Sequence, residues 1–260
     1  MPQNFNPQMR IDGLAVGFGG RIIQQELCFT IKPGSIFAIM GGSGCGKSTL
    51  LKTLIGLLPP IAGSLHVGDI DYWGGSSEQR AQIARGFGVL FQSGALWSAM
   101  TVAQNVALPL QMLTALDAPS IDSLVTCKLG LVGLAHAADM MPADLSGGMR
   151  KRAGLARALA LDPGILFFDE PSAGLDPILS RRLDDLISQL RDGFGCTVVI
   201  VSHELPSLLA ICDDGIFLDS ESKTAIAHGS PKSLLEHCDH PLVHAFMRRE
   251  TTPEEAPVGN

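Results

Sequence analysis

A glycine-rich segment with a single lysine, Gly41–Ser48, constrains the fold of this chain more than any other feature. It reads Gly-Gly-Ser-Gly-Cys-Gly-Lys-Ser and lies between an apolar run, Ser35–Met40, and a helical pattern, Lys47–Leu57. This order predicts a buried strand, a phosphate-binding loop and a helix. The alternative, a glycine-rich turn with a surface lysine, does not explain why a strand and a helix flank the loop directly.

The composition of the loop suits the phosphates of a nucleotide. Glycines let successive backbone N–H groups point inward around the phosphates, and the N-terminus of the helix adds its partial positive charge. Lys47 would reach the β and γ phosphates, and the Ser48 hydroxyl would bind Mg²⁺. The predicted nucleotide-binding residues here are Gly41, Gly42, Ser43, Gly44, Cys45, Gly46, Lys47, Ser48 and Thr49.

Two carboxylates follow a second apolar strand, Ile165–Phe168. Asp169 and Glu170 would lie at the carboxyl end of the sheet, where open α/β folds bind their ligands. Asp169 would organise Mg²⁺ and its waters. Glu170, expected on the opposite side of the strand, could polarise the attacking water by accepting a hydrogen bond from it. Taken alone, the pattern could be a strand that ends in a polar turn; together with the loop it indicates a hydrolytic site.

Short apolar runs without alternation predict strands that are buried on both faces of a mostly parallel sheet. They are Ser35–Met40, Gly88–Phe91, Ile165–Phe168 and Thr197–Val201. Helical patterns cover Lys47–Leu57, Val102–Leu113, Ser120–Leu131, Gly148–Leu159 and Ile178–Arg191. From about Ser93 to Ala160 only helices are predicted, so we expect a helical subdomain inserted into the α/β core. The Pro/Glu-rich segment Thr251–Asn260 is expected to be disordered or a docking tail.

Composition argues against several classes of protein. The 260-residue chain has 19 Lys and Arg against 26 Asp and Glu, and it has no long basic run, so nucleic acid is a poor candidate partner. Mean hydropathy is +0.25, yet no stretch reaches the roughly 18 uncharged apolar residues that span a bilayer. The polar segment Met1–Arg10 does not have the pattern of a secretory signal, so we expect a cytoplasmic protein. Scattered cysteines predict reduced thiols rather than zinc sites or disulfides: Cys28, Cys45, Cys127, Cys196, Cys212 and Cys238.

A third motif lies in the sequence between the phosphate-binding loop and the strand Ile165–Phe168, and it narrows the class of protein. Leu145–Arg152 reads Leu-Ser-Gly-Gly-Met-Arg-Lys-Arg and opens a predicted helix. Ser146 would cap this helix, while Gly147 and Gly148 would let an anion approach its N-terminus closely. The segment resembles the LSGG signature of ABC transporter ATPases. Because the chain's own phosphate site is already complete, we expect the signature to face the ATP of a second copy in a head-to-tail dimer.

Other landmarks of this family follow in the family's order. Gln92 resembles the Q-loop glutamine, whose amide can reach Mg²⁺ and the attacking water, and His203 resembles the switch histidine that contacts the γ phosphate. Ser172–Asp176 resembles the D-loop that crosses the dimer. Phe18 lies where the family often places an aromatic residue that stacks on adenine, with core packing as the alternative. The resemblance implies ATP and Mg²⁺ as cofactors. The catalytic residues that it implies are Glu170, His203 and Gln92, and the metal-binding residues are Ser48, Gln92 and Asp169. The further nucleotide-binding residues that it implies are Phe18, Ser146, Gly147, Gly148 and Asp176.

The resemblance also implies a fold and a domain organisation. We expect a P-loop (RecA-like) α/β core with a mostly parallel sheet, an antiparallel β region and the inserted helical subdomain at about 93–160. A single ATPase domain would cover residues 10–240, and residues 241–260 would form a C-terminal tail.

Within the family, several stretches look like the ATPase of Mla-type (MCE-associated) lipid transporters of Gram-negative bacteria. They are Phe87–Leu96, Met100–Val102, Asn105–Leu110, Gly147–Met149, Asp176–Ile178, Val201–Pro206 and Ala227–Pro231. This likeness implies transport of phospholipid between the inner and outer membranes by a chain on the cytoplasmic face of the inner membrane. The implied partners are an integral permease, an MCE-domain protein and a small STAS-like subunit.

Several alternatives stay open at this point. Trp97 and Met100 are either contact residues for the permease or buried packing residues. The transporter could be an importer of polar solutes or a lipoprotein-release system, and the chain could be a regulatory ABC protein without a transporter. The sequence contains no substrate site, so it does not define the cargo or the direction of transport.

Overall fold

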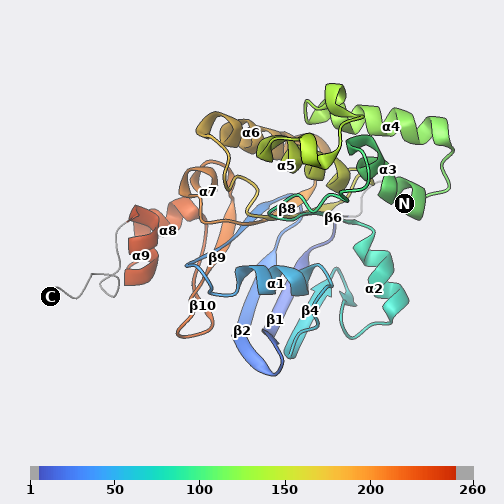
Figure 1. Ribbon diagram of the computed structural model, residues 1–260. Coiled ribbons are helices and arrows are strands. Elements are labelled where there is room, and N and C mark those ends of the chain that lie inside the picture. The colour runs from blue at the N-terminus through green and yellow to red at the C-terminus, as the bar shows by residue number, and fades with distance from the viewer. Residues whose placement is uncertain (1–5, 250–260) are drawn as a thin grey trace.

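The part of the chain that the structure describes builds two β-sheets, with helices on both sides of the larger one (Figure 1). The computed structural model describes residues 6–249. The larger sheet has six strands in the order β10-β9-β3-β8-β7-β6, and its pairs are parallel except for β9 with β10. These strands are β3 (Ile36–Gly41), β6 (Phe87–Leu90), β7 (Ile165–Asp169), β8 (Thr197–Val201), β9 (Asp214–Leu218) and β10 (Ala225–His228). The parallel arrangement brings the carboxyl ends of β3, β6, β7 and β8 to one edge of the sheet.

The smaller sheet is antiparallel and has the order β2-β1-β4-β5. Its strands are β1 (Met9–Phe18), β2 (Arg21–Ile31), β4 (Ala62–Val67) and β5 (Ile70–Asp71). A mostly parallel core sheet with an antiparallel β region confirms the predicted fold class. The four strands predicted from apolar runs lie within one residue of β3, β6, β7 and β8.

The helices connect these strands and cover both faces of the larger sheet. They are α1 (Lys47–Leu54), α2 (Ser77–Ala84), α3 (Val102–Leu113), α4 (Ala118–Leu131), α5 (Gly147–Ala158), α6 (Pro177–Phe194), α7 (Leu205–Ile211), α8 (Pro231–His237) and α9 (Pro241–Arg248). Figure 1 shows α3, α4, α5 and α6 on one side of the sheet, and α1 with the antiparallel sheet on the other. From Ser93 to Ala160 the described secondary structure consists of α3, α4, α5 and two short 3₁₀ turns.

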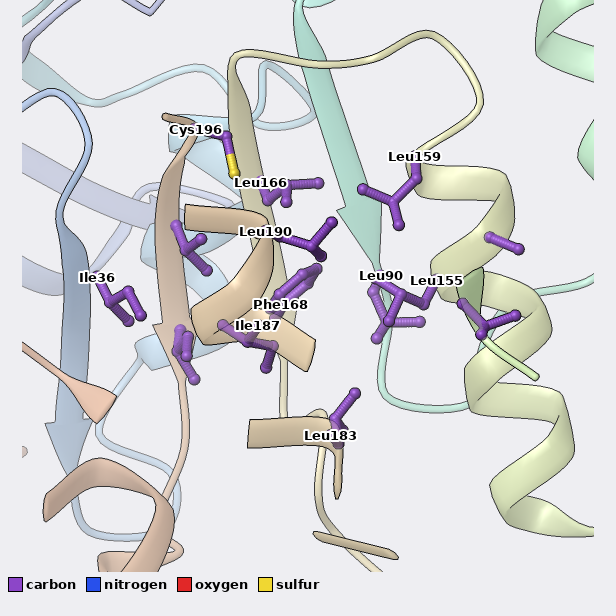
Figure 2. Close-up of a cluster of buried hydrophobic side chains, with 14 of the residues drawn as sticks. Ile36, Leu90, Leu155, Leu159, Leu166, Phe168, Leu183, Ile187, Leu190 and Cys196 are labelled. Atoms are coloured by element: carbon purple, nitrogen blue, oxygen red, sulfur yellow. The ribbon is translucent and has the colours of Figure 1, made fainter. Parts of the chain in front are cut away.

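The alternation of side chains along β3 divides the core into two clusters. Phe37 and Ile39 belong to the cluster shared with α1 and the antiparallel sheet. Ile36, Ala38 and Met40 belong to the cluster shared with the helical side, as expected for a strand whose successive side chains point to opposite faces. Figure 2 shows part of the second cluster, in which side chains from the sheet, α5 and α6 meet. The sheet is therefore a rigid support for the loops at its carboxyl edge.

The prediction of a tail from residue 241 is wrong for its first part. Pro241–Arg248 forms α9, whose Val243, Ala245 and Met247 are buried. Phe246 makes an edge contact with Phe217 of β9, with ring centroids 5.0 Å apart. Burial of one apolar face supplies the driving force for this helix. The expected disordered or docking segment, Thr251–Asn260, lies outside the described residues.

Candidate functional site

The segment Gly41–Ser48 forms a turn between β3 and α1, and two of its glycines are required by geometry. Gly41 has φ +141°, and a Cβ there would lie 2.4 Å from the Leu218 carbonyl oxygen. Gly46 caps α1 with φ +100°, and a Cβ there would lie 2.6 Å from Cγ2 of Ile23. Only glycine adopts these backbone conformations without strain and leaves this space free. The first turn of α1 therefore opens toward the carboxyl edge of the sheet, as an anion-binding loop requires.

Lys47 lies inside this loop. Its side chain is buried, and Nζ donates hydrogen bonds to the carbonyl oxygens of Gly41 at 2.8 Å and Gly42 at 2.7 Å. Cys45 is also buried, and burial raises the pKa of its thiol although the Lys47 charge acts in the opposite direction. The thiol therefore stays protonated near neutral pH and fills space, while the ammonium is the charged group that the loop offers to a phosphate.

Ser48 and Asp169 meet at the carboxyl edge, from α1 and the end of β7. The Ser48 hydroxyl donates to Oδ1 of Asp169 at 3.2 Å. Burial raises the pKa of Asp169, and the hydrogen bond from Ser48 lowers it. One hydroxyl beside one carboxylate fits Mg²⁺, which in nucleotide sites takes one or two protein oxygens and completes its shell with phosphate oxygens and water. The described residues contain no cluster of three or more carboxylate, His or Cys side chains for a metal.

Glu170 does not continue the strand, which corrects the expectation that it lies on the opposite side of β7. The strand ends at Asp169, and Glu170 has φ +51°, a rare conformation for a residue with a side chain. Its backbone N–H donates to the Val201 carbonyl oxygen at 2.8 Å. Its Oε1 lies 2.8 Å from Nδ1 of His203, and its buried Oε2 has no hydrogen-bond partner in the described structure. Such an orphaned oxygen is available to accept a hydrogen bond from a reacting water.

The loop after β6 carries Gln92, whose side chain is exposed. This loop is held against α5 by Arg157, which donates to the carbonyl oxygens of Gly94 at 3.0 Å and Ala95 at 2.7 Å. Sequence reasoning missed Arg157, because a charged residue near the end of a helix resembles a solvated surface position. The structure places Gln92 at the same edge as Asp169, since β6 and β7 are parallel neighbours.

Ser146 caps α5 as predicted: its hydroxyl accepts a hydrogen bond from the Met149 N–H at 3.3 Å. Ser146 and Gly147 are exposed, so the start of α5 is open to a ligand. Figure 1 places α5 and α1 on opposite faces of the six-stranded sheet, so the signature segment and the phosphate loop come from different layers of the molecule. This separation suits a signature that serves another subunit.

The segment Ser172–Asp176 connects β7 to α6. Asp176 caps α6, because its Oδ1 accepts hydrogen bonds from the N–H groups of Ile178 and Leu179, both at 3.0 Å. This contact gives Asp176 a structural role, and its predicted contact with nucleotide stays a prediction. The buried Ser172 hydroxyl has no hydrogen-bond partner among the described groups.

Two aromatic side chains whose burial was left open by the sequence are exposed. Phe18 at the end of β1 is 48% exposed, and the Lys52 ammonium lies 5.9 Å from its ring centroid. Core packing is therefore excluded for Phe18, and adenine stacking stays a prediction. Trp97 is 60% exposed, whereas Met100 is partly buried.

The loop that presents Trp97 is fixed by Asn105, a fully buried residue of α3. Its side-chain oxygen accepts from the Trp97 N–H at 2.8 Å. Its amide donates to the carbonyl oxygens of Trp97, Met100 and Thr101, at 3.1, 3.1 and 2.9 Å. Trp97 is thus an exposed aromatic on a preorganised loop, as an anchor residue at an interface would be.

Comparison with known proteins agrees with this geometry. Residues 24–173 match the family model described as ABC transporter. The intermembrane phospholipid transport system ATP-binding protein MlaF of Escherichia coli K12 is 43% identical over 229 residues, which cover 88% of this chain and 84% of MlaF. The probable ribonucleotide transport ATP-binding protein mkl of Mycobacterium tuberculosis is 39% identical, over 92% of this chain and 66% of that protein. A dimeric ATP-binding cassette in a post-hydrolysis state bound to ADP and phosphate superimposes with a TM-score of 0.78 at 27% identity, over 85% of this chain and 97% of that one.

The chain belongs to the ABC transporter family, as an ATP-hydrolysing ATP-binding subunit. The Gly41–Ser48 loop, Asp169 and the Glu170–His203 contact lie at the carboxyl edge of the sheet, and Ser146 caps α5. The catalytic and binding roles of these residues stay predictions. Among the described residues, no helix combines the length and the apolar character that a membrane span would need.

Proposed function

We propose that this chain hydrolyses ATP to drive phospholipid transport between the inner and outer membranes of a Gram-negative cell envelope. The observation that carries the proposal is the 43% identity to MlaF over 88% of the chain. Since no helix of the described residues could span a membrane, the chain acts through an integral permease at the cytoplasmic face of the inner membrane. Moving a two-chain phospholipid into water costs roughly 20 kcal/mol at ~0.8 kcal/mol per CH₂, so the partners must shield the lipid tails.

The active unit is a head-to-tail dimer of two copies with ATP between the Gly41–Ser48 loop of one and the Ser146 helix start of the other. Dimeric architecture in a related cassette supports this arrangement. Lys47 binds the β and γ phosphates, and Phe18 stacks on the adenine. Asp176 lies beside the nucleotide at the dimer interface.

The chemistry depends on the orientation and activation of one water molecule. Ser48, Asp169 and Gln92 would hold Mg²⁺, which would neutralise charge on the phosphates. Glu170 accepts a hydrogen bond from the attacking water through Oε2 and takes up its proton. His203 holds the Glu170 carboxylate through the 2.8 Å contact with Oε1 and approaches the γ phosphate.

The partner surface is the loop that presents Trp97. An exposed tryptophan, fixed by the buried Asn105, supplies a rigid apolar anchor for the permease. An MCE-domain protein that extends into the periplasm and a small STAS-like cytoplasmic subunit would complete the transporter.

Deletion of the gene tests whether the cargo is phospholipid. We expect sensitivity to detergent to rise and phospholipid to accumulate in the outer leaflet of the outer membrane, with unchanged uptake of amino acids. The intact gene should restore the barrier, and a gene that encodes Glu170→Gln should not. An intact barrier together with the loss of uptake of one polar solute would contradict lipid transport and leave the ATPase assignment standing.

A further inference from the structure

Lys151 makes an unusual contact between two parts of the ATPase site. It lies on α5, five positions after the Ser146 cap, and it is only 8% exposed. Its Nζ donates a hydrogen bond to the Glu170 carbonyl oxygen at 3.0 Å and another to the Ala173 carbonyl oxygen. One side chain of the signature helix therefore holds the backbone on both sides of Ser172.

Burial of the Lys151 ammonium costs more free energy than burial of an apolar side chain would. A buried ammonium loses its hydration, and carbonyl dipoles compensate only part of that loss. Burial accordingly lowers the pKa of Lys151, whereas the Glu170 and Glu204 carboxylates raise it. An apolar side chain of the same length would fill the space without this penalty, so the charged contact indicates a requirement for the specific position of the Glu170–Ala173 backbone.

The packing beside Lys151 leaves room for movement. A cavity of about 440 Å³ lies between the end of α4, α5 and α6, and Lys151 and Gly148 form part of its wall with Leu175 and Leu179. A Cβ at Gly148 would lie only 3.3 Å from Leu175 and 3.4 Å from Leu179, so the first turn of α5 touches the start of α6 while the space beyond is open. The hydrogen bonds of Lys151 form a direct polar link between α5 and the segment that carries Glu170.

We propose that Lys151 is a positioning residue that couples the signature helix to the backbone of Glu170 in the same chain. Ser146 and Lys151 lie on one rigid helix, about 7.5 Å apart along its axis at 1.5 Å per residue. When Ser146 engages the ATP of the partner, the shift of α5 reaches Glu170 through Lys151. Occupation of one composite site then adjusts the catalytic carboxylate of the other. This proposal rests on the head-to-tail dimer described above.

The test compares Lys151→Met with Lys151→Arg in the full transporter complex. We expect Lys151→Met to lower kcat by about 10- to 100-fold, because small displacements of a catalytic group have effects of this size, with less than about a threefold change in the binding of a non-hydrolysable ATP analogue. The Hill coefficient for ATP should fall from above 1 to about 1 as the coupling between sites is lost. Lys151→Arg keeps the charge and the hydrogen-bond donors, so its kcat and its Hill coefficient should lie between those of Lys151→Met and the parent.

Lys128→Met is the matched control. Lys128, in the last turn of α4, is another buried lysine, 6% exposed, and it pairs with Asp162, which follows α5. This substitution should leave kcat and the Hill coefficient near those of the parent, and a similar loss in both variants would reduce Lys151 to a structural role and overturn the proposal. Cooperative hydrolysis that persists in Lys151→Met would overturn it as well. A parent enzyme without cooperativity would instead contradict the coupled dimer itself.

Discussion

Glu170→Gln is expected to lower steady-state ATP hydrolysis by about 100- to 1000-fold while ATP binding stays nearly intact. The amide has the shape of the carboxylate and can still accept the contact with His203 at the Oε1 position. It cannot take up a proton from the attacking water, because the atom at the Oε2 position becomes the amide nitrogen, which donates hydrogen bonds and does not act as a base. Phosphate release by the purified complex and equilibrium binding of ATP measure the two halves of this expectation.

Glu204→Gln provides the control for this substitution. Its carboxylate lies 3.8 Å from Nε2 of His203, which is beyond hydrogen-bonding distance. Hydrolysis by Glu204→Gln should stay within about threefold of the parent, since a long, partly exposed ion pair contributes little. Near-normal hydrolysis by Glu170→Gln would remove Glu170 from its role as the base.

The second large effect concerns Ser146 and Lys47, which should act on one nucleotide from different subunits. Covalently linked dimers can carry Lys47→Ala and Ser146→Arg either on one subunit or on opposite subunits. On opposite subunits both lesions fall in one composite site and the other site stays intact. On one subunit each composite site carries a lesion. We expect the first dimer to bind one ATP tightly, and the second to bind none tightly and to lose at least about 100-fold in hydrolysis.

The single-substitution dimers serve as controls, since each leaves one intact site and should bind one ATP tightly. The reverse ranking of the two double-substitution dimers would show that Ser146 serves the ATP of its own subunit. That outcome would contradict the head-to-tail arrangement and the coupling through Lys151, without affecting the role of Glu170.

Features that depend on local chemistry could be predicted from the sequence. The glycines at positions 41 and 46 are dictated by backbone conformation and close approach, and the strand ends at Asp169 and Val201 follow from short apolar runs. The antiparallel sheet was expected only from family resemblance, because its strands have mixed burial that gives no clear pattern. Helix α9 was missed because its short apolar face becomes stable only by packing on the rest of the chain.

The parts of the site that could not be predicted involve long polar side chains that turn inward. Lys151 and Arg157 read as charged positions on a helix surface, yet both donate to backbone carbonyls of distant loops. Asn105 resembles the other polar residues of a mostly apolar helix, and its four hydrogen bonds depend on the path of the preceding loop. The left-handed conformation of Glu170 likewise depends on its hydrogen bond to β8, a contact between distant parts of the chain.

Reconstitution of the transporter in liposomes shows most directly whether ATP hydrolysis by this chain drives phospholipid movement. The chain would be placed in liposomes with its permease and the proposed MCE-domain partner, and transfer of a fluorescent phospholipid would be followed beside phosphate release. We expect transfer that requires ATP, that is lost in Glu170→Gln in proportion to hydrolysis, and that is retained in Glu204→Gln. Phospholipid transfer that proceeds at the same rate in Glu170→Gln, or ATP hydrolysis that moves a polar solute while phospholipid stays in place, would contradict ATP-driven phospholipid transport by this chain.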